Sequence, residues 1–135
     1  MGEELRIQQE LTKDMLCRLI DPDKSVRESA VEALAVSTED ENWRPNELIR
    51  QGGIDILTGL LHDKNTHIVG SALDVIIAIA AAGEEEALIS GGVIAWLDRM
   101  QDHENPLIRE KVQEALWLLV PEVEEAVTSK PQDEY

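Results

Sequence analysis

The sequence repeats itself at intervals of about 40 residues, and this constrains the fold more than any other feature. Three segments align without gaps, their first residues 42 and then 40 positions apart: VRESAVEALAV (26–36), IVGSALDVIIA (68–78) and IREKVQEALWL (108–118). Two Gly-Gly pairs (52–53 and 91–92) lie 39 positions apart. A short helical unit cannot bury its apolar face alone, so neighbouring units stack and share a core. The repeat therefore predicts a stacked array of helices.

The segment from Ile68 to Gly83 is the most apolar part of the chain and is expected to form its central helix. A surface helix has one apolar stripe, whereas this segment is apolar around most of its circumference. Gly83 is expected to end the helix, because glycine tolerates the left-handed conformation. The two halves of the chain should therefore cover this helix from both sides.

Proline, glycine and polar clusters divide the rest of the chain into further helices. The expected segments are 3–20, 26–37, 45–51, 54–61, 84–90, 93–101 and 107–120. Ser25 is expected to cap the second helix in a capping box with Glu28, and Thr66 to cap the central helix. Alternation of apolar and polar residues at period two is scarce, so no strand is expected. The predicted fold class is all-α.

Two stretches resemble the armadillo repeat, a unit of three helices with Gly-Gly between the first and second: NELIRQGGIDILTGLLHDKNTHIVGSALDVIIAIA and EEEALISGGVIAWLDRMQDHENPLIREKVQEALWLLV. The first unit, LIDPDKSVRESAVEAL, is similar to a HEAT repeat. The resemblance covers about residues 15–120 and implies a right-handed α-solenoid. We expect one domain over 1–128, with repeats at about 3–37, 45–82 and 84–120, a C-terminal cap at 121–128 and a polar tail at 129–135.

The charge balance limits the classes of partner. The chain has 28 acidic and 12 basic residues and a formal net charge of −16. Such a surface repels phosphate backbones and anionic lipid, so neither nucleic acid nor membrane is an expected partner. No signal peptide is visible and no apolar run reaches the roughly 20 residues of a membrane span, which favours a cytoplasmic protein. Basic protein surfaces are the natural complement; alternatively, the acidity serves only solubility.

A column of carboxylates is the candidate binding site. The resemblance implies a concave face formed by the third helices, where armadillo arrays that hold extended peptides carry a Trp and, four residues later, an Asn. The corresponding pairs of positions here are Glu32/Val36, Asp74/Ala78 and Glu114/Leu118, so that ladder is absent. Glu28 and Glu110 lie one turn before the first and last of the three acids. Such a column would bind Lys or Arg side chains through charge-assisted hydrogen bonds. The alternative is that these residues are acidic for helix propensity and solubility.

Three other side chains allow an interpretation. Trp117 is next to the acidic column, and it either anchors a partner there or packs against 121–128 as part of the cap. Trp96 is expected in the core. Cys17, the only cysteine, lies in an apolar row and is expected to be a small buried residue.

No motif indicates catalysis, a metal or a cofactor. His62, His67 and His103 lie in turns, and the Gly-Gly pairs lack a phosphate-binding pattern. We therefore expect a non-catalytic adaptor or regulatory module, a monomer or weak homo-oligomer, that binds a basic protein or peptide. One alternative is a self-associating or end-stacking subunit, which exposed apolar residues at Leu5 and Leu11 or at Val123 and Val127 would favour. A co-chaperone or lyase-like role is a further alternative, implied by family analogy alone.

Overall fold

The computed structural model describes residues 2–120, and within them it contains only helices, turns and loops. The predicted cap at 121–128 and tail at 129–135 lie outside the described residues, so the proposed extent of the domain stays a prediction. The helices are α1 (Gly2–Leu19), α2 (Lys24–Ser37), α3 (Asn46–Arg50), α4 (Gly53–Leu60), α5 (Thr66–Ala81), α6 (Glu85–Ser90), α7 (Val93–Arg99), the 3₁₀ turn η1 (Met100–Asp102) and α8 (Pro106–Leu119).

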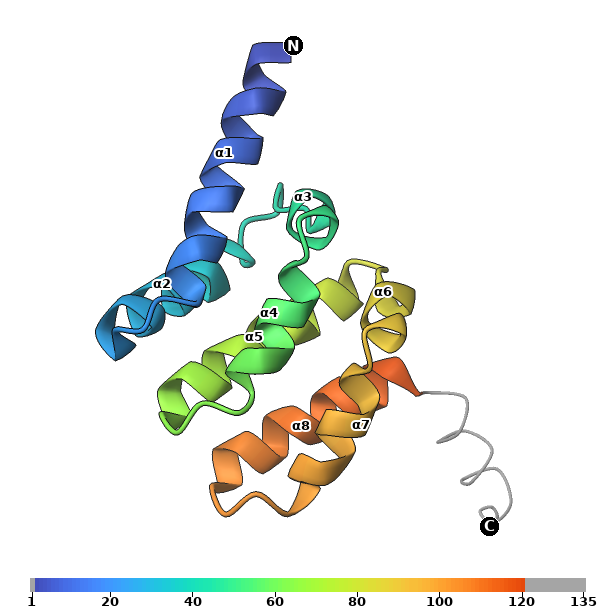
Figure 1. The fold of residues 1–135 in the computed structure, drawn as a ribbon. Coiled ribbons are helices and arrows are strands. Elements are labelled where there is room, and N and C mark those ends of the chain that lie inside the picture. The colour runs from blue at the N-terminus through green and yellow to red at the C-terminus, as the bar shows by residue number, and fades with distance from the viewer. Residues whose placement is uncertain (1, 121–135) are drawn as a thin grey trace.

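The long helices stack in two layers (Figure 1). One layer consists of α2, α5 and α8, and α5 packs against α2 on one side and α8 on the other. The other layer contains α4 and α7, with α1 at the N-terminal end of the stack. This arrangement confirms the expected stack of helical units.

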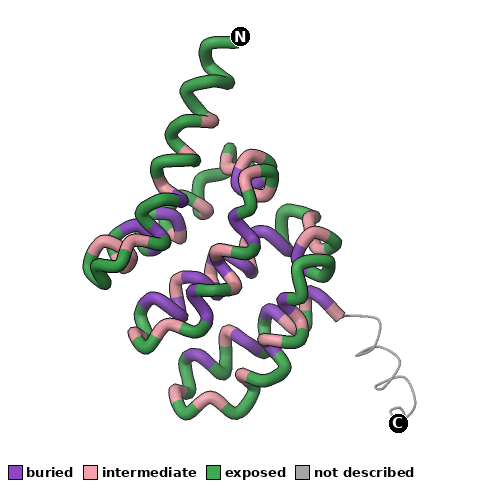
Figure 2. The backbone as a smooth tube through the Cα atoms, in the orientation of Figure 1, coloured by how far each residue is buried: buried purple, intermediate pink, exposed green. Residues whose placement is uncertain are grey.

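The central helix α5 is the best-covered element, as its composition predicts (Figure 2). Its buried residues are Ile68, Val69, Gly70, Ala72, Leu73, Val75, Ile76, Ile79 and Ala80. They occupy most of the helix circumference because α2, α4 and α8 all contact it. The helix ends as expected, since Gly83 adopts a left-handed φ of 92°.

The three long helices of this layer begin at equivalent capping residues, which differ from those predicted. Asp23 caps α2, and its carboxylate accepts hydrogen bonds from the backbone N–H and the hydroxyl of Ser25. Asn65 and Asn105 cap α5 and α8, and each side-chain oxygen accepts from the backbone N–H groups two and three residues further on. The predicted capping box at Ser25 and the predicted cap at Thr66 are therefore wrong by one or two residues. Asp and Asn side chains offer an acceptor oxygen for capping, as Ser and Thr do. Here the Asp or Asn precedes the predicted cap by one or two residues and takes its place.

The glycine turns follow a period of 40 residues rather than the 39 suggested by the Gly-Gly pairs. Gly52 and Gly92 have left-handed φ values of 85° and 80° and cap α4 and α7. The second glycine of the first pair, Gly53, therefore corresponds to Val93 and not to Gly92. Gly53 and Val93 are each buried at the first position of their helix.

One prediction of burial is wrong, and another is confirmed only in part. Cys17 is exposed, because the buried stripe at the end of α1 runs through Leu16 and Leu19. Trp96 lies at the edge of the core and is only partly buried. Its ring centroid is 3.9 Å from that of His62, and the guanidinium carbon of Arg99 lies 4.7 Å from the ring centroid. An indole at a helix surface can bury its ring face and leave its edge accessible.

Candidate functional site

The exposed surface of α2, α5 and α8 that carries Glu32, Asp74 and Glu114 is called here the third-helix face. Between α2 and α5 this face is hollowed into a groove of about 470 Å³. The groove is lined by Glu32, Ala35, Val36, Thr38, Glu39, Ser71 and Asp74. Two of the predicted acids, Glu32 and Asp74, therefore share one groove although they belong to different repeats.

Glu39 is a third carboxylate in this groove that the sequence-based column does not include. It lies just beyond the end of α2, in the polar break between the first two repeats. A helical spacing was present in the sequence, because Glu32, Val36 and Glu39 follow each other at intervals of four and three residues. The repeat alignment hides it, since it compares only equivalent positions within the helices.

A second, smaller groove of about 200 Å³ lies between α5 and α8. Ser71 and Asp74 line both grooves, so the two hollows meet at the middle of α5. The Lys111 amino group on α8 donates a hydrogen bond of 2.7 Å to Asp74 Oδ1. Both side chains stay partly exposed, at 34% for Lys111 and 43% for Asp74. One acid of the column is therefore already paired with a Lys of its own chain.

The remaining predicted acids have different surroundings. Glu28 is half-buried, and its carboxylate accepts a 3.3 Å hydrogen bond from the side-chain amide of Asn65. This contact joins α2 to the capping residue of α5, so Glu28 links two repeats. Glu110 and Glu114 are exposed on α8 and line neither of the two grooves. The structure thus brings together Glu32 and Asp74 and adds Glu39.

Trp117 is exposed on α8, with 59% of its surface accessible. Its repeat equivalents, Ala35 and Ile77, are partly buried and pack against the core. The predicted packing of Trp117 against 121–128 involves residues outside the described part of the chain.

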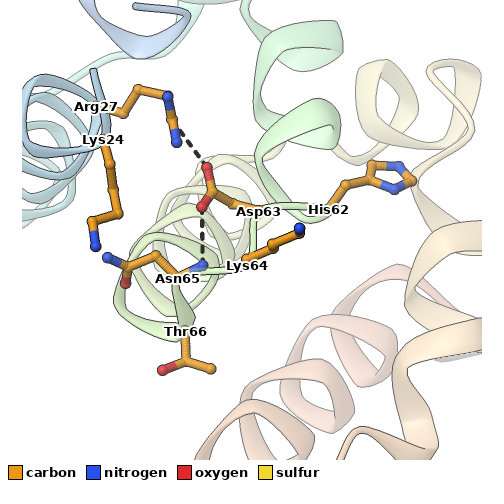
Figure 3. A pocket seen from close by; sticks show the side chains of 7 residues that line it. All are labelled: Lys24, Arg27, His62, Asp63, Lys64, Asn65 and Thr66. Carbon is orange, nitrogen blue, oxygen red and sulfur yellow. Dashed lines mark hydrogen bonds and ion pairs between the residues drawn. The ribbon is translucent and has the colours of Figure 1, made fainter. Parts of the chain in front are cut away.

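A third hollow lies between the start of α2 and the turn that precedes α5 (Figure 3). Arg27 and Lys24 on α2 face Asp63 and Asn65 of the second repeat, and Lys64 also lines the hollow. Arg27 Nε donates to Asp63 Oδ2 at 3.0 Å, and these side chains are only 21% and 11% exposed. This hollow is therefore the site of an ion pair that joins two repeats.

Within the described residues, the structure gives no sign of a metal site or of a membrane-spanning helix. Within 2–120, no group of three or more His, Cys, Asp or Glu side chains is placed to hold a metal ion. His103 Nδ1 accepts a hydrogen bond from the backbone N–H of Asn105, so this histidine supports a turn. None of the helices in this range is both long and apolar enough to cross a bilayer.

Solved structures of designed armadillo repeat proteins are similar to the chain. One, in complex with the peptide (KR)4, is 25% identical with a TM-score of 0.75, and the match covers 84% of this chain and 48% of that one. A computationally designed armadillo repeat protein for modular peptide recognition is 25% identical with a TM-score of 0.76, covering 87% and 51%. A third designed armadillo repeat protein is 27% identical with a TM-score of 0.70, covering 78% and 45%. The chain thus spans about half the length of these proteins. No protein-family model and no curated protein matches the sequence.

The two-layered stack of helical units, together with its match to designed armadillo repeat structures, defines the class of the protein as a right-handed α-solenoid. Within that class it is an armadillo/HEAT-like helical-repeat protein, as the sequence resemblance implies. This fold is typically a non-catalytic scaffold suited to binding proteins or peptides.

Proposed function

We propose that the chain is a non-catalytic interaction module, an adaptor or regulatory subunit, that binds a basic extended segment of a partner protein on its third-helix face. The observation that carries the proposal is the groove between α2 and α5, which three carboxylates line: Glu32 and Asp74 from two repeats, and Glu39 from the break between them. Carboxylates grouped in this way favour Lys and Arg through charge-assisted hydrogen bonds.

The groove also offers apolar contact to the stems of such side chains. Val36 is 66% exposed and lines the groove beside the carboxylates. Lys and Arg bury their methylene stems against apolar surface while their charged ends remain solvated or paired. Glu32 and Val36 occupy the positions at which peptide-binding armadillo arrays carry Trp and Asn, so recognition here would rest on charge and not on that ladder.

The similarity to designed proteins supports the same ligand chemistry. The solved structure of one of them is a complex with the peptide (KR)4, in which Lys and Arg alternate. Packed helices lie about 8–10 Å apart and an extended peptide advances about 3.3 Å per residue. A segment lying across α2, α5 and α8 would therefore contact each repeat with about two or three residues.

A titration with a peptide of alternating Lys and Arg tests the proposal. The informative variant is Glu32→Gln/Asp74→Asn/Glu114→Gln, which we expect to bind at least about tenfold more weakly than the wild type. The matched control is Glu10→Gln/Asp55→Asn/Glu86→Gln, which removes three exposed carboxylates from α1, α4 and α6. Both variants lose three of the negative charges that make up the net −16.

The control separates a local site from the overall charge. Binding by the control close to that of the wild type supports the third-helix face. An equal loss in both variants would mean that net charge alone attracts the peptide. Absence of wild-type binding at moderate salt would remove the proposal.

A further inference from the structure

The first two repeats are joined by an ion pair with a specific geometry (Figure 3). Arg27 Nη1 donates to the carbonyl oxygens of Asp21 and Pro22, at 2.8 Å and 3.0 Å, and its Nε donates to Asp63 Oδ2 of the next repeat. Asp63 is held in place because its Oδ1 accepts from the backbone N–H of Asn65 at 3.0 Å. One arginine thus binds its own turn and the following repeat together.

Arg109 has the same position and the same local contact in the third repeat. It follows Ile108 as Arg27 follows Val26. Its Nη1 donates at 2.7 Å to the carbonyl of His103, six residues earlier, as Arg27 does to that of Asp21. Arg109 is exposed, and within residues 2–120 no carboxylate forms an ion pair with it.

Asp21 is the counterpart of Asp63 at the other end of the described stack. Its Oδ1 accepts from the backbone N–H of Asp23 at 2.8 Å, as Asp63 Oδ1 accepts from Asn65. In the described part of the chain Asp21 forms no ion pair, because no repeat precedes it there. The described stack therefore holds an arginine at one end and an aspartate at the other, each with the local hydrogen bonds that Arg27 and Asp63 make in their ion pair.

The apolar surfaces of the two ends are also complementary. Trp117 is exposed at a position where Ala35 lines the groove against the following repeat and Ile77 is partly buried against the core. Ala33 on α2 is exposed at a position where Val75 on α5 and Ala115 on α8 are fully buried. Stacking of one end on the other would cover both.

We propose that copies of the chain associate head to tail, with α8 of one copy stacked on α2 of a second. In this contact Arg109 of one copy pairs with Asp21 of the second, and Trp117 covers Ala33. The new interface repeats the one between the first two repeats. Such a contact is heterologous, so it allows chains of more than two copies. The net charge of −16 opposes association at low ionic strength and is screened at physiological salt.

Analytical ultracentrifugation across micromolar to millimolar concentrations tests this proposal. The average mass of the wild type should rise with concentration above the 15.1 kDa of one chain. Arg109→Glu and Asp21→Asn should each weaken the association constant at least about tenfold, since each removes one partner of a desolvated pair. Asp21→Asn keeps the oxygen that accepts from Asp23, so the turn is preserved.

The charge swap and a matched control complete the experiment. Arg109→Glu/Asp21→Lys should restore association, because the pair is re-formed with opposite polarity. Lys64→Glu makes the same change of charge as Arg109→Glu at an exposed turn residue and should leave association unchanged. A wild type that stays monomeric throughout, or Arg109→Glu and Asp21→Asn variants that both associate as strongly as the wild type, would overturn the proposal. Stacking uses Arg109 and Asp21, which the peptide titration leaves unaltered, so either proposal can fail without the other.

Discussion

Asp74 belongs to the proposed binding face and is also one partner of an ion pair within the chain. It lines both grooves of the third-helix face, and it also pairs with Lys111 at 2.7 Å. A basic ligand would have to share or displace this lysine. Because the pair is partly exposed, its contribution is about 0.2–1 kcal/mol, small enough for a ligand to overcome.

Replacement of Lys111 should therefore strengthen binding. We predict that Lys111→Gln raises the affinity for a peptide of alternating Lys and Arg about twofold to fivefold, since it releases Asp74 and removes a repelling charge. Lys13→Gln, at an exposed position of α1, removes the same charge elsewhere and is the control. Isothermal titration calorimetry measures both. An unchanged affinity in Lys111→Gln would place the ligand away from Asp74.

Glu39 tests whether the groove or the column is the relevant unit. Glu39→Gln should weaken peptide binding several-fold, because Glu39 lines the same groove as Glu32. Glu41→Gln alters an exposed carboxylate two residues further on and should have little effect. If the two variants bind the peptide equally well, Glu39 and the segment that follows α2 take no part in recognition.

At the scale of the helix, glycine has opposite roles at the two ends of α4. Gly52 caps the helix with a φ of 85°, whereas Gly59 is helical and a Cβ there meets no atom within 4 Å. We predict that Gly52→Ala lowers the free energy of unfolding by about 1–2 kcal/mol, because of left-handed strain. Gly59→Ala should raise it by about 0.4–1 kcal/mol, because the unfolded chain loses entropy. Urea unfolding followed by circular dichroism gives the change in the free energy of unfolding for each variant. Changes of the same sign would contradict the left-handed turn at Gly52.

The helix caps differ in charge, so their contributions should differ in pH dependence. The hydrogen bonds from the side chain and backbone of Ser25 hold the pKa of Asp23 below its ordinary value of 3.8. A lowered pKa means that this cap stabilises the fold above the unfolded-state value and loses its effect as the pH falls through the lower, folded-state value. Asp23→Ala should thus be most destabilising at neutral pH, and its effect should shrink below pH 3.8.

Asn105 caps α8 without a charge and is the control for this effect. Asn105→Ala should cost about 1 kcal/mol at either pH, because no proton is exchanged. Denaturant unfolding at neutral pH and again in acid measures both variants. A difference between wild type and Asp23→Ala that persists unchanged in acid would contradict the role of the carboxylate.

At the scale of the molecule, the repeat made the stacking of helices predictable, because residues such as Ala72 and Val75 recur at positions that stacking buries. The capping residues are harder to predict, since Asp23 and Ser25 are both good caps and only the path of the preceding turn selects between them. Cys17 was misjudged because an apolar row in sequence does not give the phase of a helix relative to its neighbours. The pairing of Asp74 with Lys111 joins two residues 37 positions apart on different helices, and neither helix alone carries a signal for it.

The central claim is that the third-helix face binds a basic segment, and mapping by nuclear magnetic resonance tests it most directly. A peptide of alternating Lys and Arg would be added to ¹⁵N-labelled protein while the backbone amide shifts are followed. The account predicts that the largest changes lie around Glu32, Glu39, Ser71 and Asp74, where α2 and α5 border the groove. Changes concentrated on α1, α4 and α7, or none at a saturating peptide concentration, would contradict it.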